Sequence, residues 1–215
     1  MPAAWPAAAA SVWRPGRLTD LVARGFVGAL FVLLSINLLA DFSRTHRFTG
    51  LLLLVSEALV VVLTIVRRPT DVVDRSAAAA IVAAVSMAGP PLFRAGGAAA
   101  IVPDAFTALL SAAGLSLVIA GKVALGRSFG IVPANRGVIA GGPYRLMRHP
   151  IYAGYLLTHV GFLLAHPRPA NIALALIADA ALVIRLFYEE RVLSADGRYR
   201  AYCRLVAWHL VPGLF

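Results

Sequence analysis

The sequence predicts an all-α fold: a polytopic transmembrane helical bundle of about six spans with a C-terminal interfacial segment. Of its 215 residues, 60% are hydrophobic and only 14% are charged, whereas soluble domains carry about 45–50% apolar and about 25% charged residues. The apolar residues occur in runs close in length to the roughly 20 residues that cross a bilayer. Basic residues lie between these runs, as in the cytoplasmic loops of membrane proteins. A water-soluble fold could not bury so much apolar surface, whereas lipid makes burial unnecessary.

The N-terminal half is expected to supply four spans. Residues 1–20 are rich in Ala and Pro and are expected to form a cytoplasmic segment. The apolar run 21–40 is long for the core of a signal peptide and lacks a clear cleavage site, so we interpret it as a retained first span. Three further spans are expected at 49–66, 76–93 and 103–125. Residues 21–125 would then form a block of four transmembrane helices.

Residues 126–215 are expected to form a second region of different character. The polar, Gly-rich stretch 126–150 interrupts the apolar pattern. Two apolar segments, 151–165 and 169–187, follow and are joined by only three residues, so they should form an antiparallel helical hairpin. The last segment, 188–215, is charged and aromatic and is expected to lie at the membrane interface, where it would cap the site described below.

The positive-inside rule predicts the orientation. With six spans and a cytoplasmic N-terminus, only four of the 20 Lys and Arg residues would lie outside: Arg44, Arg47, Arg94 and Arg168. We therefore expect a multi-pass protein of a bacterial inner (plasma) membrane with both termini in the cytoplasm. The net charge of +10 is explained by these loops, and no separate basic block with interleaved aromatics indicates nucleic acid. Cys203 is the only cysteine, which excludes an internal disulfide and a CxxC metal site.

The segment 142–154 is the richest in residues that could carry chemistry. A Gly-Pro turn begins it, and His149-Pro150 then starts a helix, because proline is well tolerated in a first helical turn. The free N–H groups of that turn could hold a ligand carboxylate. The alternative is that these side chains are interfacial anchors, with Tyr144 and Tyr152 in an aromatic belt.

A second constellation lies at the end of the last span. Arg185 and Glu189 are four residues apart and share a helix face. The alternative is an ordinary ion pair in solvent. Because the hairpin returns to the start of segment 151–165, Glu189 should approach His149. We therefore expect the histidine and the acidic pair Glu189-Glu190 to line one cavity.

A third constellation lies in the C-terminal segment. Tyr199 and Tyr202 are three residues apart and would lie on one face of an interfacial helix. The alternative is a membrane-surface anchor without a ligand.

Together these motifs resemble a known family. In chain order, Arg-His-Pro-x-Tyr-x-Gly, a helical hairpin, Arg-x-x-x-Glu-Glu and Tyr-x-x-Tyr before a terminal proline resemble the isoprenylcysteine carboxyl methyltransferases, which are grouped with the phospholipid methyltransferases. The resemblance covers about 122–215. It implies a methyltransferase-like catalytic region, S-adenosyl-L-methionine as the cofactor and a lipophilic or prenylated substrate. Neither a metal nor a nucleic acid is expected.

The resemblance also implies the site residues. Cofactor binding is expected of Arg136, Gly137, Val138, Ile139, Tyr144, His149, Pro150, Ile151, Tyr152 and Glu189. Arg185 is expected to bind the substrate and to act in catalysis by orienting a carboxylate through two parallel hydrogen bonds. His149 is the second expected catalytic residue, because an amine or phenol substrate would need a base. A cofactor-binding glutamine of the family has no clear counterpart near Phe129.

The expected function is S-adenosylmethionine-dependent methyl transfer to a lipophilic membrane substrate, such as the carboxylate of an isoprenylated cysteine. A phospholipid, or another small lipophilic amine, phenol or thiol, is an alternative acceptor. A second enzyme class, the NADPH-dependent sterol-type reductases, shares Arg-His-Pro-x-Tyr but differs where this chain has Glu189-Glu190. A non-catalytic membrane protein, with the motifs as interface anchors, is the third hypothesis.

Polar residues within the spans predict helix contacts. Glu57 and Asp179 lie near the centres of their apolar runs, where a charge facing lipid costs about 2.5–3.5 kcal/mol or more. We expect both to face inward and to form interhelical hydrogen bonds, for example with Asn37 or serines. Gly114 and Gly121 predict close approach between helices.

Overall fold

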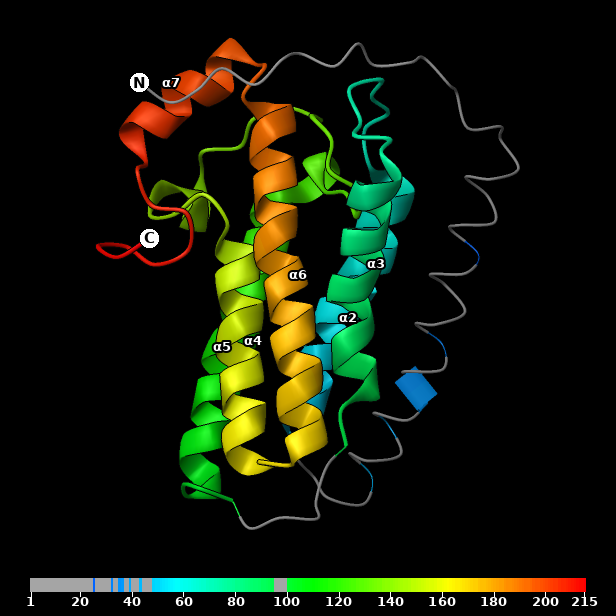
Figure 1. The fold of residues 1–215 in the computed structure, drawn as a ribbon, viewed down its shortest axis with the longest axis vertical. Coiled ribbons are helices and arrows are strands. Elements are labelled where there is room, and N and C mark those ends of the chain that lie inside the picture. Colours follow the sequence, from blue (N-terminus) through cyan, green and yellow to red (C-terminus); the bar gives the residue numbers. More distant parts are fainter. Residues whose placement is uncertain are drawn as a thin grey trace.

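A computed structural model describes residues 48–94 and 100–215, together with a few isolated positions before residue 48. The N-terminal segment 1–20 and almost all of the predicted span 21–40 lie outside the described residues. Within the described part the structure is helical, and its β-structure is limited to an isolated bridge between Val73 and Ala134 (Figure 1). The predicted all-α class is therefore confirmed for this part of the chain.

The helices follow the apolar pattern of the sequence closely. They are α2 (Phe48–Val66), α3 (Ala77–Leu92), α4 (Asp104–Leu125), α5 (Pro150–Ala165), α6 (Pro169–Leu193) and α7 (Gly197–Leu205), with short 3₁₀ turns η1 (Gly126–Ser128) and η2 (Gly142–Arg145). The predicted spans begin and end within one residue of these helices, with one exception. Helix α6 continues beyond residue 187 to Leu193, so the predicted interfacial segment begins later than expected.

Several helices have the length and surface of membrane spans. Among the described residues, the segments Asp104–Ser128 and Pro169–Leu193 are long and apolar enough to cross a bilayer, and Ala77–Gly89 and Pro150–Ala165 are shorter apolar helices. Leu109 and Leu176 point outward and are 70% and 67% exposed. Such surfaces are stable in lipid and unfavourable in water, and they indicate a membrane protein.

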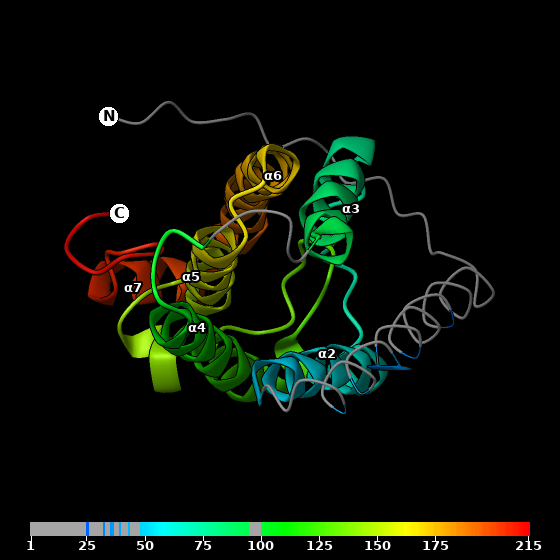
Figure 2. The same cartoon turned by 90° about the horizontal axis from the view of Figure 1, so that it is seen from below.

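The helices pack in the order α3, α6, α5, α4, α2, each against the next. Figure 2, which views the bundle from below, shows the helices arranged in this order around its axis. Helices α4 and α5 approach closely because glycines face each other, and a Cβ atom at Gly154 would lie 2.6 Å from the carbonyl oxygen of Gly114. A Cβ atom at Gly121 would lie 2.7 Å from the Ile151 side chain. The predicted close contacts at Gly114 and Gly121 are thus confirmed.

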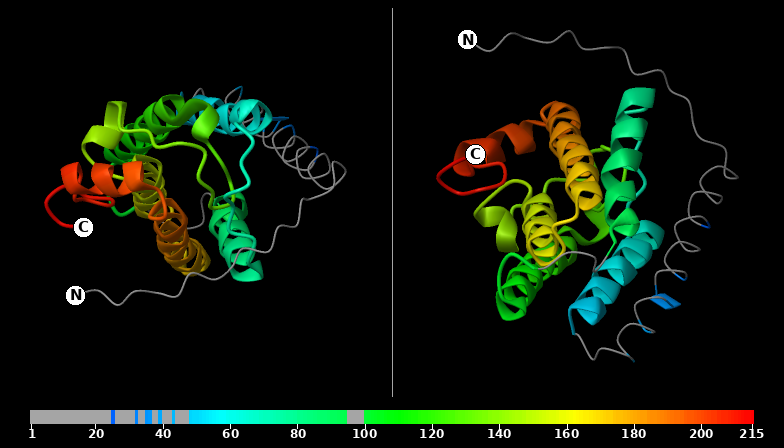
Figure 3. Two further views of the ribbon diagram at one scale, coloured as in Figure 1. Left: turned by 90° about the horizontal axis from the view of Figure 1, so that it is seen from above. Right: turned by 60° about the horizontal axis from the view of Figure 1, so that its bottom comes forward.

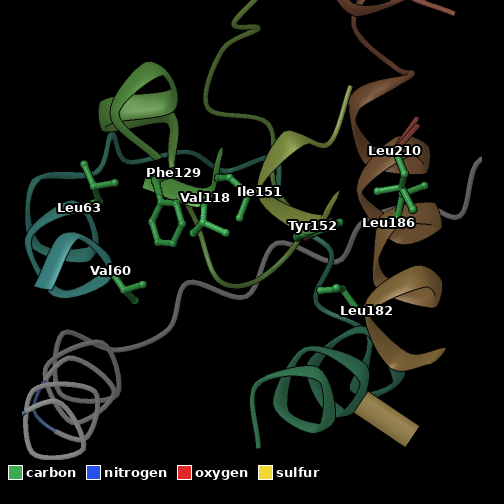
Figure 4. Packing of buried hydrophobic residues seen from close by; sticks show 9 residues of the cluster. All are labelled: Val60, Leu63, Val118, Phe129, Ile151, Tyr152, Leu182, Leu186 and Leu210. Atoms are coloured by element: carbon green, nitrogen blue, oxygen red, sulfur yellow. The ribbon is translucent and has the colours of Figure 1, made fainter. Parts of the chain in front are cut away.

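Buried apolar side chains join these helices near the loop end of the bundle, which we define as the end that carries residues 67–76, 126–149 and 194–215. One cluster, drawn in Figure 4, contains Val60, Leu63, Val118, Phe129, Ile151, Tyr152, Leu182, Leu186 and Leu210. Its members come from α2, α4, α5, α6 and two loops. The cluster therefore fixes the loop end onto the helices.

The loops at this end are tied together by hydrogen bonds. The N–H of Asp74 donates to the Pro133 carbonyl (2.9 Å) and the N–H of Asn135 donates to the Val72 carbonyl (2.9 Å). Arg191 of α6 pairs with the Asp74 carboxylate at 2.5 Å. Seen from above, these loops and α7 lie across the end of the bundle (Figure 3).

Candidate active site

A cavity of about 550 Å³ extends from the loop end into the bundle. Its lining includes residues of α2, α3, α4, α5, α6 and α7 and of the loop 126–141. Of the site residues predicted from the sequence, those that line it are Arg136, Gly137, Val138, Ile139, Tyr144, His149, Ile151, Tyr152, Arg185 and Glu189. Pro150 is buried beside the cavity but does not line it. The structure therefore brings all but one of these residues around a single space.

Glu189 is the acidic group of this cavity. Its carboxylate accepts a short hydrogen bond from the Tyr152 hydroxyl and lies 3.4 Å from Nε of Arg185. Nδ1 of His149 lies 3.9 Å from the same carboxylate. The prediction that the hairpin brings Glu189 to His149 is therefore confirmed.

Arg185 is the buried cation opposite Glu189, and it is only 8% exposed. Its guanidinium carbon lies 5.3 Å from the centre of the Tyr152 ring, and one terminal nitrogen donates to the Gly130 carbonyl (3.3 Å). Nε makes no hydrogen bond within the described residues, because its approach to Glu189 is poorly aligned. An arginine donor in the cavity wall thus remains available to a ligand.

Glu190 has a different environment from Glu189. Its Oε1 accepts hydrogen bonds from Nε2 of His149 (2.9 Å) and from the Tyr199 hydroxyl (2.7 Å). Arg148 pairs with its other oxygen at 3.5 Å. Glu190 does not line the cavity, so the expectation that both acids would do so is wrong. Consecutive helical residues point about 100° apart, and Glu190 instead holds His149 and α7 in place.

The start of α5 has fewer unpaired N–H groups than the sequence suggested. Pro150 has no N–H, and the N–H groups of Tyr152 and Ala153 both donate to the His149 carbonyl (3.1 Å each). The N–H of His149 donates to the His209 carbonyl (2.9 Å). These donors are already paired, so an anion site here would depend on the N–H of Ile151 and stays a prediction, whereas Pro150 serves to start the helix.

Helix α7 covers the cavity with tyrosines. Tyr144, Tyr199 and Tyr202 are each 5–7% exposed and pack together. The Tyr202 hydroxyl donates to the Tyr144 carbonyl (2.7 Å). Burial, and secondarily the charge of Glu189, raises the pKa of Tyr144 far above its ordinary value. The shared face predicted for Tyr199 and Tyr202 is confirmed, and it points into the cavity rather than toward lipid.

Arg136 adds a second cation from the loop. A Cβ atom at Gly130 would collide with its guanidinium, so a larger residue there would displace the Arg136 side chain. Its Nε is buried without a hydrogen-bond partner within the described residues. Burial, and secondarily the neighbouring Arg67 cation, lowers the pKa of Arg136. Arg136 therefore presents an unused buried donor in the cavity wall.

Some lining residues were not predicted as site residues. They include the ionisable or aromatic residues Arg148, Tyr155, His159, Tyr199 and Tyr202. Two features of the sequence could have indicated some of them: the i, i+3 spacing of Tyr199 and Tyr202, and the position of the ionisable His159 within an apolar segment.

The fold and the cavity define a helical membrane protein with a buried, charged site. Residues 95–196, slightly less than half of the chain, match the family model of the phospholipid methyltransferases. A curated relative, protein-S-isoprenylcysteine O-methyltransferase A of Arabidopsis thaliana, is 34% identical over 110 residues, covering 44% of this chain and 55% of the relative. The chain thus spans about half the length of that relative. No solved structure matches the chain significantly.

These matches confirm the resemblance that the motifs carry. Residues 95–196 are similar to the phospholipid methyltransferases, and part of the chain is similar to an isoprenylcysteine O-methyltransferase.

Proposed function

We propose that this protein transfers a methyl group from S-adenosylmethionine to a lipophilic substrate held in the cavity. The observation that supports this most strongly is that a carboxylate, three arginines and several aromatic rings meet around one buried space. The family match is to methyltransferases, which favours this activity over a sterol-type reductase or a non-catalytic protein.

The residues around the cavity suit S-adenosylmethionine, which would supply an electrophilic methyl group on a sulfonium. Glu189 offers a carboxylate for the ammonium group, and the unpaired Nε of Arg136 suits the carboxylate. The rings of Tyr144 and Tyr152 would face the sulfonium, because aromatic faces attract cations. A volume of about 550 Å³ lies within the usual range of about 300–1,000 Å³ for small-molecule sites.

Arg185 is the proposed substrate-orienting residue. Its guanidinium is buried and keeps an unused donor, and a planar fork of donors is suited to a carboxylate. A carboxylate acceptor is already ionised and needs no base. Catalysis then consists largely of holding the acceptor oxygen in line with the methyl group.

The environment of His149 favours a carboxylate over an amine or phenol acceptor. Both of its ring nitrogens face carboxylates, at 2.9 Å from Glu190 and 3.9 Å from Glu189. A histidine held in this way positions the start of α5 and is poorly placed to remove a proton from a substrate. The relative's name, an isoprenylcysteine O-methyltransferase, supports the same acceptor class.

We further propose that the bundle has six spans in a bacterial inner membrane, with the loop end and both termini in the cytoplasm. The basic residues Arg67, Arg68, Arg127, Arg145 and Arg148 belong to the loop end, in accordance with the positive-inside rule.

Calorimetric binding of S-adenosylhomocysteine to the detergent-purified chain tests the cofactor part of the proposal. We expect wild type to bind and Glu189→Gln to bind at least tenfold more weakly, because a hydrogen bond to a charged group is worth about 1.5–3 kcal/mol. Asp104→Asn, a matched substitution at an exposed residue outside the cavity, should leave binding unchanged. Absence of binding by wild type, or equal binding by Glu189→Gln, would contradict the proposal.

A further inference from the structure

The far end of the cavity carries a polar pair that the proposed reaction does not use. His159 lines the cavity and lies ten residues after His149 on α5. At 1.5 Å per residue, this places it about 15 Å deeper in the bundle. The other residues lining this end are mostly apolar and include Met87, Phe93, Leu115, Phe162 and Leu182.

Asp179 of α6 holds the imidazole of His159 in one orientation. Nδ1 of His159 lies 2.6 Å from Oδ1 of Asp179, and the carboxylate favours the proton on that nitrogen. Phe93 packs edge-on against the imidazole, with ring centres 5.4 Å apart. Asp179 does not line the cavity, so it supports His159 from behind. Asp179 is thus paired as the sequence predicted, although with a histidine rather than with Asn37 or a serine.

The other nitrogen of His159 is left available to a ligand. The structure gives Nε2 no hydrogen bond from any described residue, although the side chain is only about 7% exposed. With the proton on Nδ1, Nε2 is an acceptor. A wholly apolar chain filling this end would leave that acceptor buried and unpaired, which is unfavourable. A ligand with a hydroxyl at this depth would satisfy it.

We propose that the substrate is a lipophilic chain with a hydroxyl group about 9 Å from its methyl-accepting end, and that this hydroxyl donates a hydrogen bond to Nε2 of His159. The spacing follows from α6, where Asp179, the partner of His159, lies six residues before Arg185. Asp179 is the positioning residue that keeps Nε2 an acceptor. The proposal rests on the proposed function, because the acceptor end is placed at Arg185. It narrows the substrate from any prenyl-like chain to one with a remote polar group.

The test compares two probes on the detergent-purified full chain: N-acetyl-S-farnesylcysteine and its analogue with a hydroxyl on the chain carbon that lies about 9 Å from the carboxylate. Binding is measured by calorimetry without cofactor. We expect wild type to bind the hydroxyl analogue about tenfold more tightly, the effect of one ordinary buried hydrogen bond. His159→Phe should bind the unmodified probe at least as tightly and lose the preference. The control Phe162→Leu, on the same helix and lining the same end, should keep it.

Asp179 variants separate positioning from a structural role. Asp179→Asn retains an acceptor for Nδ1–H and should keep the preference, whereas Asp179→Leu should lose it. Equal binding of the two probes by wild type, binding of neither, or a preference that survives in His159→Phe would each overturn the proposal.

Methyl transfer and S-adenosylhomocysteine binding, measured in parallel, distinguish this failure from failure of the proposed function. A hydroxyl preference without methyl transfer or S-adenosylhomocysteine binding would support the polar pocket and contradict the enzyme activity. Methyl transfer without the preference for the hydroxyl probe would support the enzyme activity and contradict the polar pocket.

Discussion

Two tyrosines of α7 provide a matched test of how the acidic residue Glu190 holds the cap on the cavity. Tyr199 and Tyr202 are both 5% exposed, and each donates its hydroxyl hydrogen bond over 2.7 Å. They differ in the acceptor, which is the carboxylate of Glu190 for Tyr199 and the neutral carbonyl of Tyr144 for Tyr202. Replacement by phenylalanine removes only the hydroxyl in each case.

The difference in acceptor sets the expected magnitude. A hydrogen bond to a charged group contributes about 1.5–3 kcal/mol and a neutral one about 0.5–1.5 kcal/mol. Tyr199→Phe should therefore destabilise the protein by about 1 kcal/mol more than Tyr202→Phe. For a chain of this size, that corresponds to a melting temperature lower by about 2–4 °C. Thermal unfolding in one detergent measures it. Equal melting temperatures, or a larger loss in Tyr202→Phe, would refute the role assigned to Glu190.

Two further predictions concern helix packing and pH. Gly154→Ala should lower stability by about 1–3 kcal/mol, because its Cβ atom would lie 2.6 Å from the Gly114 carbonyl. Gly141→Ala, with open space around it, is the control, and equal melting temperatures would contradict the packing. Burial first, then Glu189, raises the pKa of Tyr144 in the folded protein. Stability should therefore be intact below about pH 10 and fall as pH rises above it, when the unfolded tyrosine ionises. Tyr144→Phe should therefore lose less stability above about pH 10, as measured by melting temperatures across a pH series. An unchanged dependence of the melting temperature on pH would contradict this role of Tyr144.

The helix bounds could be predicted because the apolar runs are bounded by charged or turn-forming residues. The exception is α6, which shows that an apolar run does not mark the end of a helix when good helix formers follow it. Hydrophobicity falls after Phe187, but Glu189, Glu190 and Arg191 are good helix formers. No glycine or proline occurs before Gly197, so the helix continues to Leu193.

The sequence predicts those contacts of the candidate site that follow from how the helices are connected. The short hairpin connection was enough to bring Glu189 to His149. That Glu189 lines the cavity and Glu190 does not depends on the rotation of α6 about its own axis. Residue spacing in the sequence does not predict this rotation. The same rotation decides that Asp179 meets His159. The sequence also could not show that the His149 carbonyl accepts hydrogen bonds from the N–H groups of Tyr152 and Ala153, which reduces the free donors at the start of α5.

Transfer of a labelled methyl group from S-adenosylmethionine to N-acetyl-S-farnesylcysteine tests the central claim most directly. The claim predicts a base-labile methyl ester with wild type. It also predicts at least tenfold less ester with Arg185→Lys, which keeps the charge but loses the planar fork of donors. Binding of S-adenosylhomocysteine should be equal in the two proteins. Undiminished ester formation by Arg185→Lys, or none by a wild type that binds S-adenosylhomocysteine, would contradict the role of Arg185 in orienting a carboxylate.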